Sequence, residues 1–246
     1  MSQSFDSYRI NHQLLVGLTL EEMTGALAWD RAKPHHPFTL QDPGAGAITW
    51  ASLTSGLPVL LLAPGVGAAN YVWVECASAP AADLDFALVT DDFTLVAWVR
   101  PTDLTAVNCV MCYGAQAVLG GGGYQMVIGV DGKLTFATCQ GVTTQSSQSR
   151  PNITINNWWL VGATRAGAVG LTYINGIDQT AVPGTHITPT TQTEPFHIGV
   201  RQTGSGPITY DAPFIGNIAY PRVWHRKLEP WEMLEIFTCE RHFFGV

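Results

Sequence analysis

The sequence predicts an all-β fold, an antiparallel sandwich or barrel with one helix near the C-terminus. Short runs of apolar or alternating character recur along the 246 residues, and turn residues separate them. Many short strands filled with β-branched and aromatic residues are typical of antiparallel sandwiches and barrels. Two Asx-Gly turns between such runs, and a single helix signal at the end of the chain, indicate the same class.

The strand signals are clearest where two apolar runs flank a tight turn. Asp131-Gly132 separates one pair of runs, and Asn175-Gly176 separates another. An Asx-Gly pair between such runs is the strongest short-range signal of a β-hairpin, because both residues accept a positive φ. In chain order, the predicted strands cover residues 93–99, 124–130, 133–138, 158–164, 171–174, 177–180, 196–200 and 215–220.

One convincing helix is predicted close to the C-terminus. Pro230 suits the first turn of a helix, where a backbone N–H would have no intrahelical partner in any case. Trp231, Leu234 and Phe237 then recur every three residues, which predicts that they form the apolar face. A second, short helical turn is predicted near residues 18–23.

Composition limits the possible classes of protein. A hydrophobic fraction of 46% is enough for a large core and excludes disorder. The chain has 12 Lys and Arg against 19 Asp and Glu, a net charge of −7 and no basic cluster, which argues against nucleic acid or an anionic membrane as partner. Only 13% of residues are charged, so we expect uncharged surface to contact other copies of the chain or other proteins.

The sequence has no segment typical of a secretory signal or a membrane span. Its most apolar stretch, residues 57–64, is interrupted by prolines and is far shorter than the ~20 residues of a spanning helix. These features predict synthesis in the cytoplasm without a signal peptide and no insertion into a membrane. We expect residues 1–12 to form an arm that docks on a partner, and residues 13–246 to form one domain.

Cysteine and histidine spacing gives weak metal signals. Five cysteines, an odd number, do not suggest a disulfide framework. Cys109 and Cys112 have a metal-type spacing, but on a strand residues i and i+3 point to opposite faces, so buried free thiols are expected. The adjacent His35 and His36 lie between prolines, and we interpret them as a surface loop rather than as metal ligands.

Four segments resemble the laminin-G-like jelly-roll branch of the concanavalin A-like lectin/glucanase superfamily. In order, they are residues 92–101, 158–164, 171–176 and 214–237, which are similar to the family's "DFT-x-x-x-W-V-x-P", "W-x-x-V-A-x-T", "L-Y-V-N-G" and "F-x-G-x-I-x-x-x-R-V-Y-N-R-x-L-S-x-x-E-I" motifs. The resemblance covers roughly residues 13–240 and implies an antiparallel β-sandwich of the jelly-roll type. It implies little about the ligand, because these motifs pack the sandwich. Arg222, between two apolar positions, is interpreted as a paired structural residue.

Catalytic patterns are absent from the sequence, so we predict that the chain is not an enzyme. The superfamily's glycoside hydrolases carry Glu-x-Asp-x-Glu on one strand, where period-2 spacing places an acid and a nucleophile on the same face. The nearest approach here is Asp83-Leu-Asp85, which we interpret as turn and cap carboxylates. A Gly-x-Ser-x-Gly nucleophile elbow is also missing.

Binding residues are predicted from residue type alone. Glycan sites use aromatic platforms with polar partners, although aromatic residues in a sandwich are more often core. The candidate platforms are Trp29, Trp50, Trp73, Tyr113, Tyr124 and Tyr210. Several relatives hold calcium at a sandwich rim, which needs six or more oxygen ligands. The calcium candidates are Asp83, Asp85, Asp91 and Asp92, with Asp178 and Asp211 as further carboxylates.

Two functions from different classes follow from these observations. The first is a non-catalytic structural or adhesive module on the exterior of a large assembly, such as a capsid-decoration or fibre-type protein of a phage-like virion. Its partners would be copies of itself, particle proteins and host-surface glycans. The alternative is a carbohydrate-binding lectin module, free or part of a glycan-active protein. No cofactor is predicted other than calcium.

Overall fold

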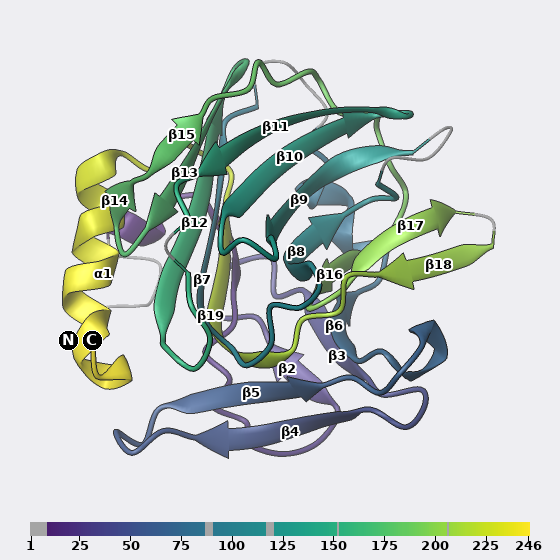
Figure 1. Cartoon of the computed structure of the whole chain (residues 1–246), viewed down its shortest axis with the longest axis vertical. Helices are drawn as coiled ribbons and strands as arrows, with labels where there is room; N and C mark the ends of the chain where they lie inside the picture. Colours follow the sequence, from purple (N-terminus) through teal and green to yellow (C-terminus); the bar gives the residue numbers. More distant parts are fainter. Residues whose placement is uncertain (1–8, 87–90, 117–120, 152, 206) are drawn as a thin grey trace.

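Two antiparallel sheets packed face to face form the molecule, as predicted, and one helix lies at its C-terminal end (Figure 1). The computed structural model describes residues 9–86, 91–116, 121–151, 153–205 and 207–246. Within these residues the first sheet contains, in spatial order, β14 (Ile177–Asp178), β13 (Val169–Ile174), β12 (Trp159–Ala166), β7 (Phe93–Pro101), β19 (Gly216–Trp224), β5 (Pro58–Ala63) and β4 (Ala47–Ser52), with β1 (Leu14–Gly17) also paired to β19.

The second sheet carries the strands that lead into the candidate site. In spatial order, its described strands are β15 (Thr180–Val182), β11 (Thr143–Ser149), β10 (Leu134–Gln140), β9 (Gly122–Ile128), β8 (Asn108–Tyr113), β16 (Phe196–Ile198), β6 (Trp73–Cys76), β3 (Pro37–Gln41) and β2 (Leu27–Trp29). The remaining elements are the hairpin β17 (Arg201–Ser205) and β18 (Ile208–Asp211), the 3-10 turns η2 (Arg9–Asn11), η3 (Ala68–Asn70) and η4 (Pro80–Leu84), and helix α1 (Pro230–Phe244).

Strand β7 explains how the sandwich gains two cores. Leu95, Ala97 and Val99 point into the main core between the sheets. Val96 and Trp98 point to the opposite face, where they join a second core beneath α1. Because both faces of β7 are covered, its sequence is a nearly continuous apolar run rather than an alternating one.

Both predicted Asx-Gly hairpins are confirmed, with different turns. Asn175 and Gly176 join β13 to β14 with φ of 52° and 77°, the pair of positive values that a type I′ turn requires. The β9–β10 connection is longer, because residues 129–133 form the loop and the N–H of Gly129 bonds to the carbonyl of Lys133 at 2.9 Å. Gly132 supplies the positive φ there.

Helix α1 begins and ends with strong local signals. Pro230 occupies the first turn, and Glu229 with Glu232 forms a capping box of reciprocal side-chain to backbone hydrogen bonds. Gly245 ends the helix in the left-handed conformation. The existence of this helix could therefore be predicted from residues within one turn of each end.

The predicted apolar face of α1 is wrong at Trp231 and Leu234, whereas Phe237 packs against the second core as predicted. Trp231 and Leu234 are 47% and 46% exposed, whereas Met233 and Ile236 are buried in the second core. Tertiary packing selects this face, because the helix lies on the outer side of the first sheet, where Trp98 stacks on its last residue at 4.1 Å between ring centroids.

The helical turn predicted near residues 18–23 is also wrong. Leu20 and Met23 have φ of 61° and 54°, which a right-handed helix cannot contain. Leu18 instead forms an isolated antiparallel bridge with Asp30. The segment is therefore an irregular loop, and it becomes one wall of the pocket described below.

Other predictions about single residues have mixed outcomes. Arg222 is paired, since its guanidinium contacts both carboxylate oxygens of Glu240 at 2.7 and 2.8 Å. Four cysteines are buried free thiols, but Cys239 is exposed. None of the described helices is long and apolar enough to cross a membrane.

The predicted N-terminal arm falls largely outside the described residues, since residues 1–8 do not belong to them. Its described part contacts its own domain, where the carbonyl of Ile10 accepts hydrogen bonds from Trp224 at 2.8 Å and Arg226 at 3.0 Å. Docking of the arm on a partner stays a prediction.

Candidate functional site

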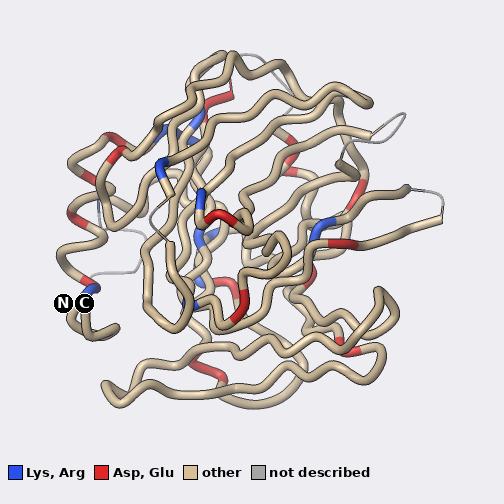
Figure 2. Tube along the Cα trace, viewed as in Figure 1, with Lys and Arg blue, Asp and Glu red and all other residues tan. Residues whose placement is uncertain are grey.

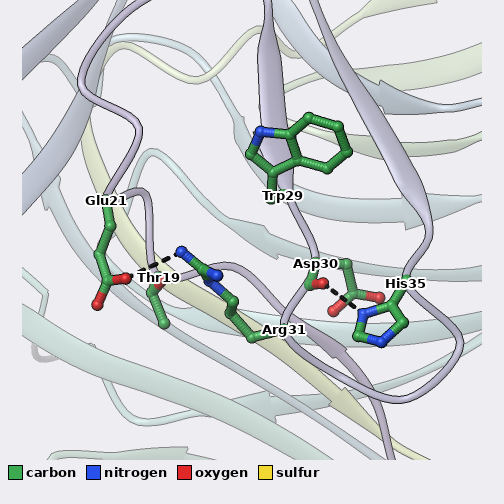
Figure 3. A pocket seen from close by; sticks show the side chains of 6 residues that line it. All are labelled: Thr19, Glu21, Trp29, Asp30, Arg31 and His35. Atoms are coloured by element: carbon green, nitrogen blue, oxygen red, sulfur yellow. Dashed lines mark hydrogen bonds and ion pairs between the residues drawn. The ribbon is translucent and has the colours of Figure 1, made fainter.

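A pocket of about 630 Å³ opens beside the end of strand β2, an edge strand of the second sheet. Six residues from the end of β2 and the loops around it line the pocket: Thr19, Glu21, Trp29, Asp30, Arg31 and His35 (Figure 3). Trp29 pairs with Pro37 of β3 through the backbone, and the residue is 56% exposed. An exposed aromatic ring surrounded by charged and polar groups is an arrangement that can stack on a ligand and hydrogen-bond to it.

Arg31 is held by acidic side chains from the preceding loop. Its Nη2 donates to Oε2 of Glu21 at 3.0 Å, and the same nitrogen lies 4.0 Å from Oε1 of Glu22. Figure 3 shows the guanidinium pointing toward Glu21, with Trp29 and His35 set apart from this pair. These contacts connect the wall at residues 19–22 to the loop that follows β2.

His35 contributes a ring with a defined proton position. Its backbone has a φ of 53°, and its Nδ1 lies 3.0 Å from the carbonyl oxygen of Asp30. Because a carbonyl only accepts, Nδ1 must carry the proton in this hydrogen bond. No hydrogen bond to Nε2 occurs among the described residues, so this atom is available to a ligand.

The carboxylate of Asp30 organises the loop beneath the pocket. Its Oδ1 accepts from the backbone N–H groups of Gly17 at 2.8 Å and Ala32 at 2.9 Å. Its Oδ2 accepts from the backbone N–H of His36 at 3.1 Å and from the His36 ring at 2.9 Å. The side chain is fully buried, so one carboxylate ties β1 to both ends of the loop.

His36 extends this network to the turn η4. Its Nε2 donates to Oδ1 of Asp83 at 2.7 Å, while Nδ1 donates to Asp30. Burial by itself lowers the pKa of His36, but the hydrogen bonds and negative charges of Asp30 and Asp83 outweigh it and raise the pKa from 6.5 to about 9. His36 is 3% exposed, so its assignment to the surface is wrong, and at neutral pH it is a buried imidazolium.

A comparison with protein families identifies the domain. The laminin-G family model Laminin_G_3, described as "Concanavalin A-like lectin/glucanases superfamily", matches residues 73–233. The chain belongs to this superfamily. The resemblance found in the sequence is thereby confirmed, although the pocket lies N-terminal to the matched residues. A search of curated protein sequences found no match to the concanavalin A-like chain.

Solved structures share the fold at low sequence identity. The binding domain of botulinum neurotoxin DC, in complex with rat synaptotagmin II, aligns with a TM-score of 0.66 and 13% identity over 94% of this chain and 52% of that chain. The same binding domain in complex with SialylT aligns with a TM-score of 0.63 and 13% identity over 94% of this chain and 52% of that chain. The concanavalin A-like chain therefore spans about half the length of these neurotoxin binding domains.

A third structure has the length of the concanavalin A-like chain. It is domain 4 of AbnA, a GH43 extracellular arabinanase from Geobacillus stearothermophilus, in complex with arabinotriose. The TM-score is 0.65 and the identity 17%, over 91% of this chain and 98% of that chain. At such identities, these likenesses establish the fold alone.

The six predicted aromatic platforms separate into four groups. Trp29 is the one that lines the pocket. Trp50 is half-buried on β4, where its Nε1 donates to the carbonyl of Gly25 at 2.9 Å. Trp73 and Tyr210 lie elsewhere, on the outer side of the second sheet, and contact each other with ring centroids 4.6 Å apart. Trp73 is only 7% exposed, so its prediction as a platform is wrong.

Tyr113 and Tyr124 are not platforms. Both side chains are fully buried in the main core and stack on each other at 5.6 Å between centroids. Their hydroxyl groups donate to backbone carbonyls at 3.0 Å. The prediction was wrong because they come from strands covered on both faces, where an aromatic residue has no route to solvent.

The predicted calcium ligands do not converge in the described residues. No three His, Cys, Asp or Glu side chains gather there in a way that could hold a metal. Each aspartate instead has its own contact: Asp83 with His36, Asp85 with the N–H of Gln192, Asp91 with His225, Asp92 with the N–H of Gly167, Asp178 with the N–H of Thr180, and Asp211 with Arg201. Burial raises the pKa of Asp85.

Sequence reasoning missed five of the six lining residues. Thr19 and Glu21 lie in the loop that was predicted to be helical, and His35 was interpreted as surface. The one available signal was the run Trp29-Asp30-Arg31, which places an aromatic residue and two opposite charges at the end of a strand. That signal identifies a candidate, but it does not say which side chain is buried.

Proposed function

We propose that the chain is a non-catalytic carbohydrate-binding module whose ligand lies on Trp29. The observation that carries the proposal is the exposed indole of Trp29 beside the charged and polar groups of a 630 Å³ pocket. Sugars present apolar C–H faces and many hydroxyl groups, so they suit a site of this composition. The arabinotriose complex of AbnA domain 4 supports the proposal by analogy of fold.

The pocket supports binding rather than hydrolysis. Paired-carboxylate hydrolysis needs one acid and one nucleophile or base with room for the sugar between them. The lining carboxylates are Glu21 and Asp30. Asp30 is buried and accepts four hydrogen bonds, so it cannot approach a sugar, and Glu21 is left without a catalytic partner among the lining residues.

The proposal is tested by the affinity of the purified chain for a panel of oligosaccharides that includes arabinotriose. Titration calorimetry with and without calcium gives the affinity of each sugar. Trp29→Ala removes the platform, and we expect at least a tenfold loss of affinity, about 1.4 kcal/mol, because aromatic contacts dominate such sites.

Trp231→Ala is the matched control. Trp231 is 47% exposed on α1, so this variant removes a similar area of surface indole far along the chain from the pocket. Its affinity for sugar should equal that of the unmodified chain. A chain that binds no oligosaccharide, or a Trp29→Ala variant that binds as well as the control, would contradict the proposal.

We further propose assembly with other copies or with particle proteins. A segment without any charged residue, from 43 to 74, supports this proposal. It includes β4 and β5, which Figure 2 draws without a single acidic or basic residue. β4 is the last strand of its sheet, so its outer backbone groups are available to pair with a further strand. Attachment to a phage-like virion is one form of such assembly and stays a prediction.

Light scattering after size-exclusion chromatography tests the assembly proposal. For the unmodified chain we expect the mass of a dimer or a larger oligomer, which is at least twice the 26.6 kDa of one chain. Thr49→Lys places a charge on the exposed edge of β4 and should shift the mass toward the monomer. Val142→Lys adds the same charge in a turn, at a residue that is 70% exposed, and should leave the mass unchanged. A monomeric unmodified chain would contradict the proposal.

A further inference from the structure

The charges around the pocket restrict the ligands that it can hold. Arg31 is the one Lys or Arg among the six lining residues. Lys33, two positions along the same loop, lines a different pocket with Gln13 and Leu14. Arg222 lines a neighbouring pocket that shares Thr19 and Glu21, but its guanidinium is paired with both oxygens of Glu240. Among the Lys and Arg side chains, a negatively charged ligand in the Trp29 pocket would therefore depend on the guanidinium of Arg31.

That guanidinium already has two acidic partners. Glu21 accepts from Nη2 of Arg31 at 3.0 Å, and a Glu22 oxygen lies 4.0 Å from the same nitrogen. Figure 3 shows the end of the Arg31 side chain directed at Glu21. Two carboxylates beside one guanidinium leave an excess of negative charge at this wall.

Glu22 depends on Arg31 more than Glu21 does. Its side chain is 10% exposed, and both carboxylate oxygens are buried without a hydrogen-bond partner among the described residues. Glu21 is 61% exposed, so water can solvate it. If a ligand carboxylate drew Arg31 away, Glu22 would become a buried charge with no compensating cation, which is strongly unfavourable.

The network below the pocket adds no positive charge. His36 is a cation, but Asp30 and Asp83 bracket it at 2.9 and 2.7 Å. Two carboxylates again surround one cation. The net charge of −7 on the whole chain acts in the same direction, since it repels anions approaching from solution.

We infer that the Trp29 pocket selects uncharged saccharides over acidic ones such as uronic or sialic acids. The inference rests on the proposed function and names the class of ligand. A neutral sugar ring stacks on Trp29, and its hydroxyl groups donate to the Glu21 carboxylate and to Nε2 of His35. Neither interaction disturbs the pairing of Arg31 with Glu22. A ligand carboxylate meets repulsion from the same two glutamates.

Matched sugar pairs test the selectivity. Trigalactose and trigalacturonic acid differ in the oxidation of C6, and lactose and 3′-sialyllactose differ by one sialic acid. Titrations of the full chain at low salt should give at least about tenfold tighter binding for the neutral member of each pair that binds. Tighter or equal binding of the acidic member would overturn the inference.

Glutamine variants test the cause of the selectivity. Glu22→Gln releases Arg31 from its buried partner, so we expect the acidic sugar to gain about tenfold in affinity and the neutral sugar to change less than twofold. Glu21→Gln, at an exposed position where folding is not at risk, should move the preference in the same direction. Glu235→Gln makes the same change of net charge at an exposed position of α1 and should move neither affinity.

The possible results separate this inference from the proposed function. Binding that Trp29→Ala abolishes, together with a preference for acidic sugars, overturns the selectivity and leaves the function standing. Failure of every sugar to bind overturns both. A neutral preference that neither Glu21→Gln nor Glu22→Gln reduces would contradict the role assigned to the two glutamates.

Discussion

The molecule contains two largely buried ionic networks that stabilise neighbouring parts of the sandwich by different chemistry, since Gly17 of β1 pairs with Arg222 and also donates to Asp30. In the C-terminal half, the Arg222 guanidinium contacts both oxygens of Glu240 and holds α1 on the first sheet. In the N-terminal part, His36 joins Asp30 to Asp83 beneath the pocket. Each network places one cation that is mostly or fully buried against carboxylates, so leaving that cation unpaired would be costly.

The two networks differ in how the charge of their cation depends on pH. Guanidinium groups stay charged in proteins, so the cation of the Arg222–Glu240 pair does not depend on pH between about 6 and 10. The cation of the second network is an imidazolium, which loses its charge near the raised pKa of His36. The fold is thus held by a permanent pair in one region and by a titratable one under the candidate site.

The largest expected effect comes from Asp30→Ala. It leaves the backbone N–H groups of Gly17, Ala32 and His36 without an acceptor and removes one partner of the His36 ring. Because all of these groups are buried, we expect the free energy of unfolding to fall by about 3–5 kcal/mol. Urea denaturation measures this loss, and sugar binding at the pocket should disappear with it.

Asp42→Ala is the matched control for this change. Asp42 follows β3, is exposed, and lies close to Asp30 in the sequence. We expect its effect on the free energy of unfolding to stay within about 0.5 kcal/mol. Equal effects of the two variants would show that the hydrogen bonds of the Asp30 carboxylate do not stabilise the loop.

The second prediction concerns pH. The pKa of His36 is about 9 in the folded chain and 6.5 when unperturbed, so the folded state binds the proton more tightly. The resulting stabilisation is complete below about pH 6.5 and is lost as the pH rises through 9. Comparison of the unmodified chain with His36→Gln, by urea denaturation from pH 6 to 10, should give a difference that shrinks by about 3 kcal/mol.

The comparison with His36→Gln removes the contribution of other groups that titrate at high pH. Burial raises the pKa of nearby Cys76 to about 12, so its thiol does not titrate in this range. A difference between the two proteins that stays constant with pH would mean that His36 is neutral in the folded chain.

A smaller effect is expected at the permanent pair. Glu240→Gln keeps one oxygen that can accept from Trp98 Nε1, which donates to Glu240 at 2.7 Å, but it loses the charge that Arg222 requires. The Arg222 and Glu240 side chains are 12% and 17% exposed, so water compensates part of the loss. We expect the free energy of unfolding to fall by about 2 kcal/mol at both pH 6 and pH 10. A strong pH dependence would contradict the contrast between the networks.

The same two regions show what the sequence could predict. α1 was predicted from two local signals, Pro230 in its first turn and the recurrence of apolar residues every three positions. The Asn175-Gly176 hairpin was found for the same reason. The superfamily could be predicted from the order of four motifs, because the motif residues pack the sandwich in the same succession along the chain, and the family model confirms it.

The pocket could not be predicted in the same way, because its order comes from contacts distant in sequence. His36 and Asp83 are 47 positions apart, and Gly17 and Asp30 are 13 apart. Nothing local distinguishes a buried, doubly paired His36 from its exposed neighbour His35. Tyr113 and Tyr124 failed as candidates for a related reason, since β8 and β9 are buried throughout and periodicity then gives no information about exposure.

The smallest effect distinguishes local opening of the pocket region from general loss of stability. Cys76 is fully buried, and its burial together with the negative charges of Asp83 and Asp30 raises the pKa of its thiol. Because the thiolate is the reactive form, Cys76 should react slowly with a maleimide in the folded chain. In a Cys239→Ser background, which removes the exposed thiol, His36→Gln should speed modification of Cys76 several-fold at pH 7.5, as measured by peptide mass spectrometry. Glu240→Gln lowers global stability by a similar amount but leaves the network at Asp30 intact, so it should speed this reaction much less. Equal acceleration in both variants would mean that the pocket region opens only when the entire sandwich unfolds, and the contrast between the two networks would then be one of charge alone.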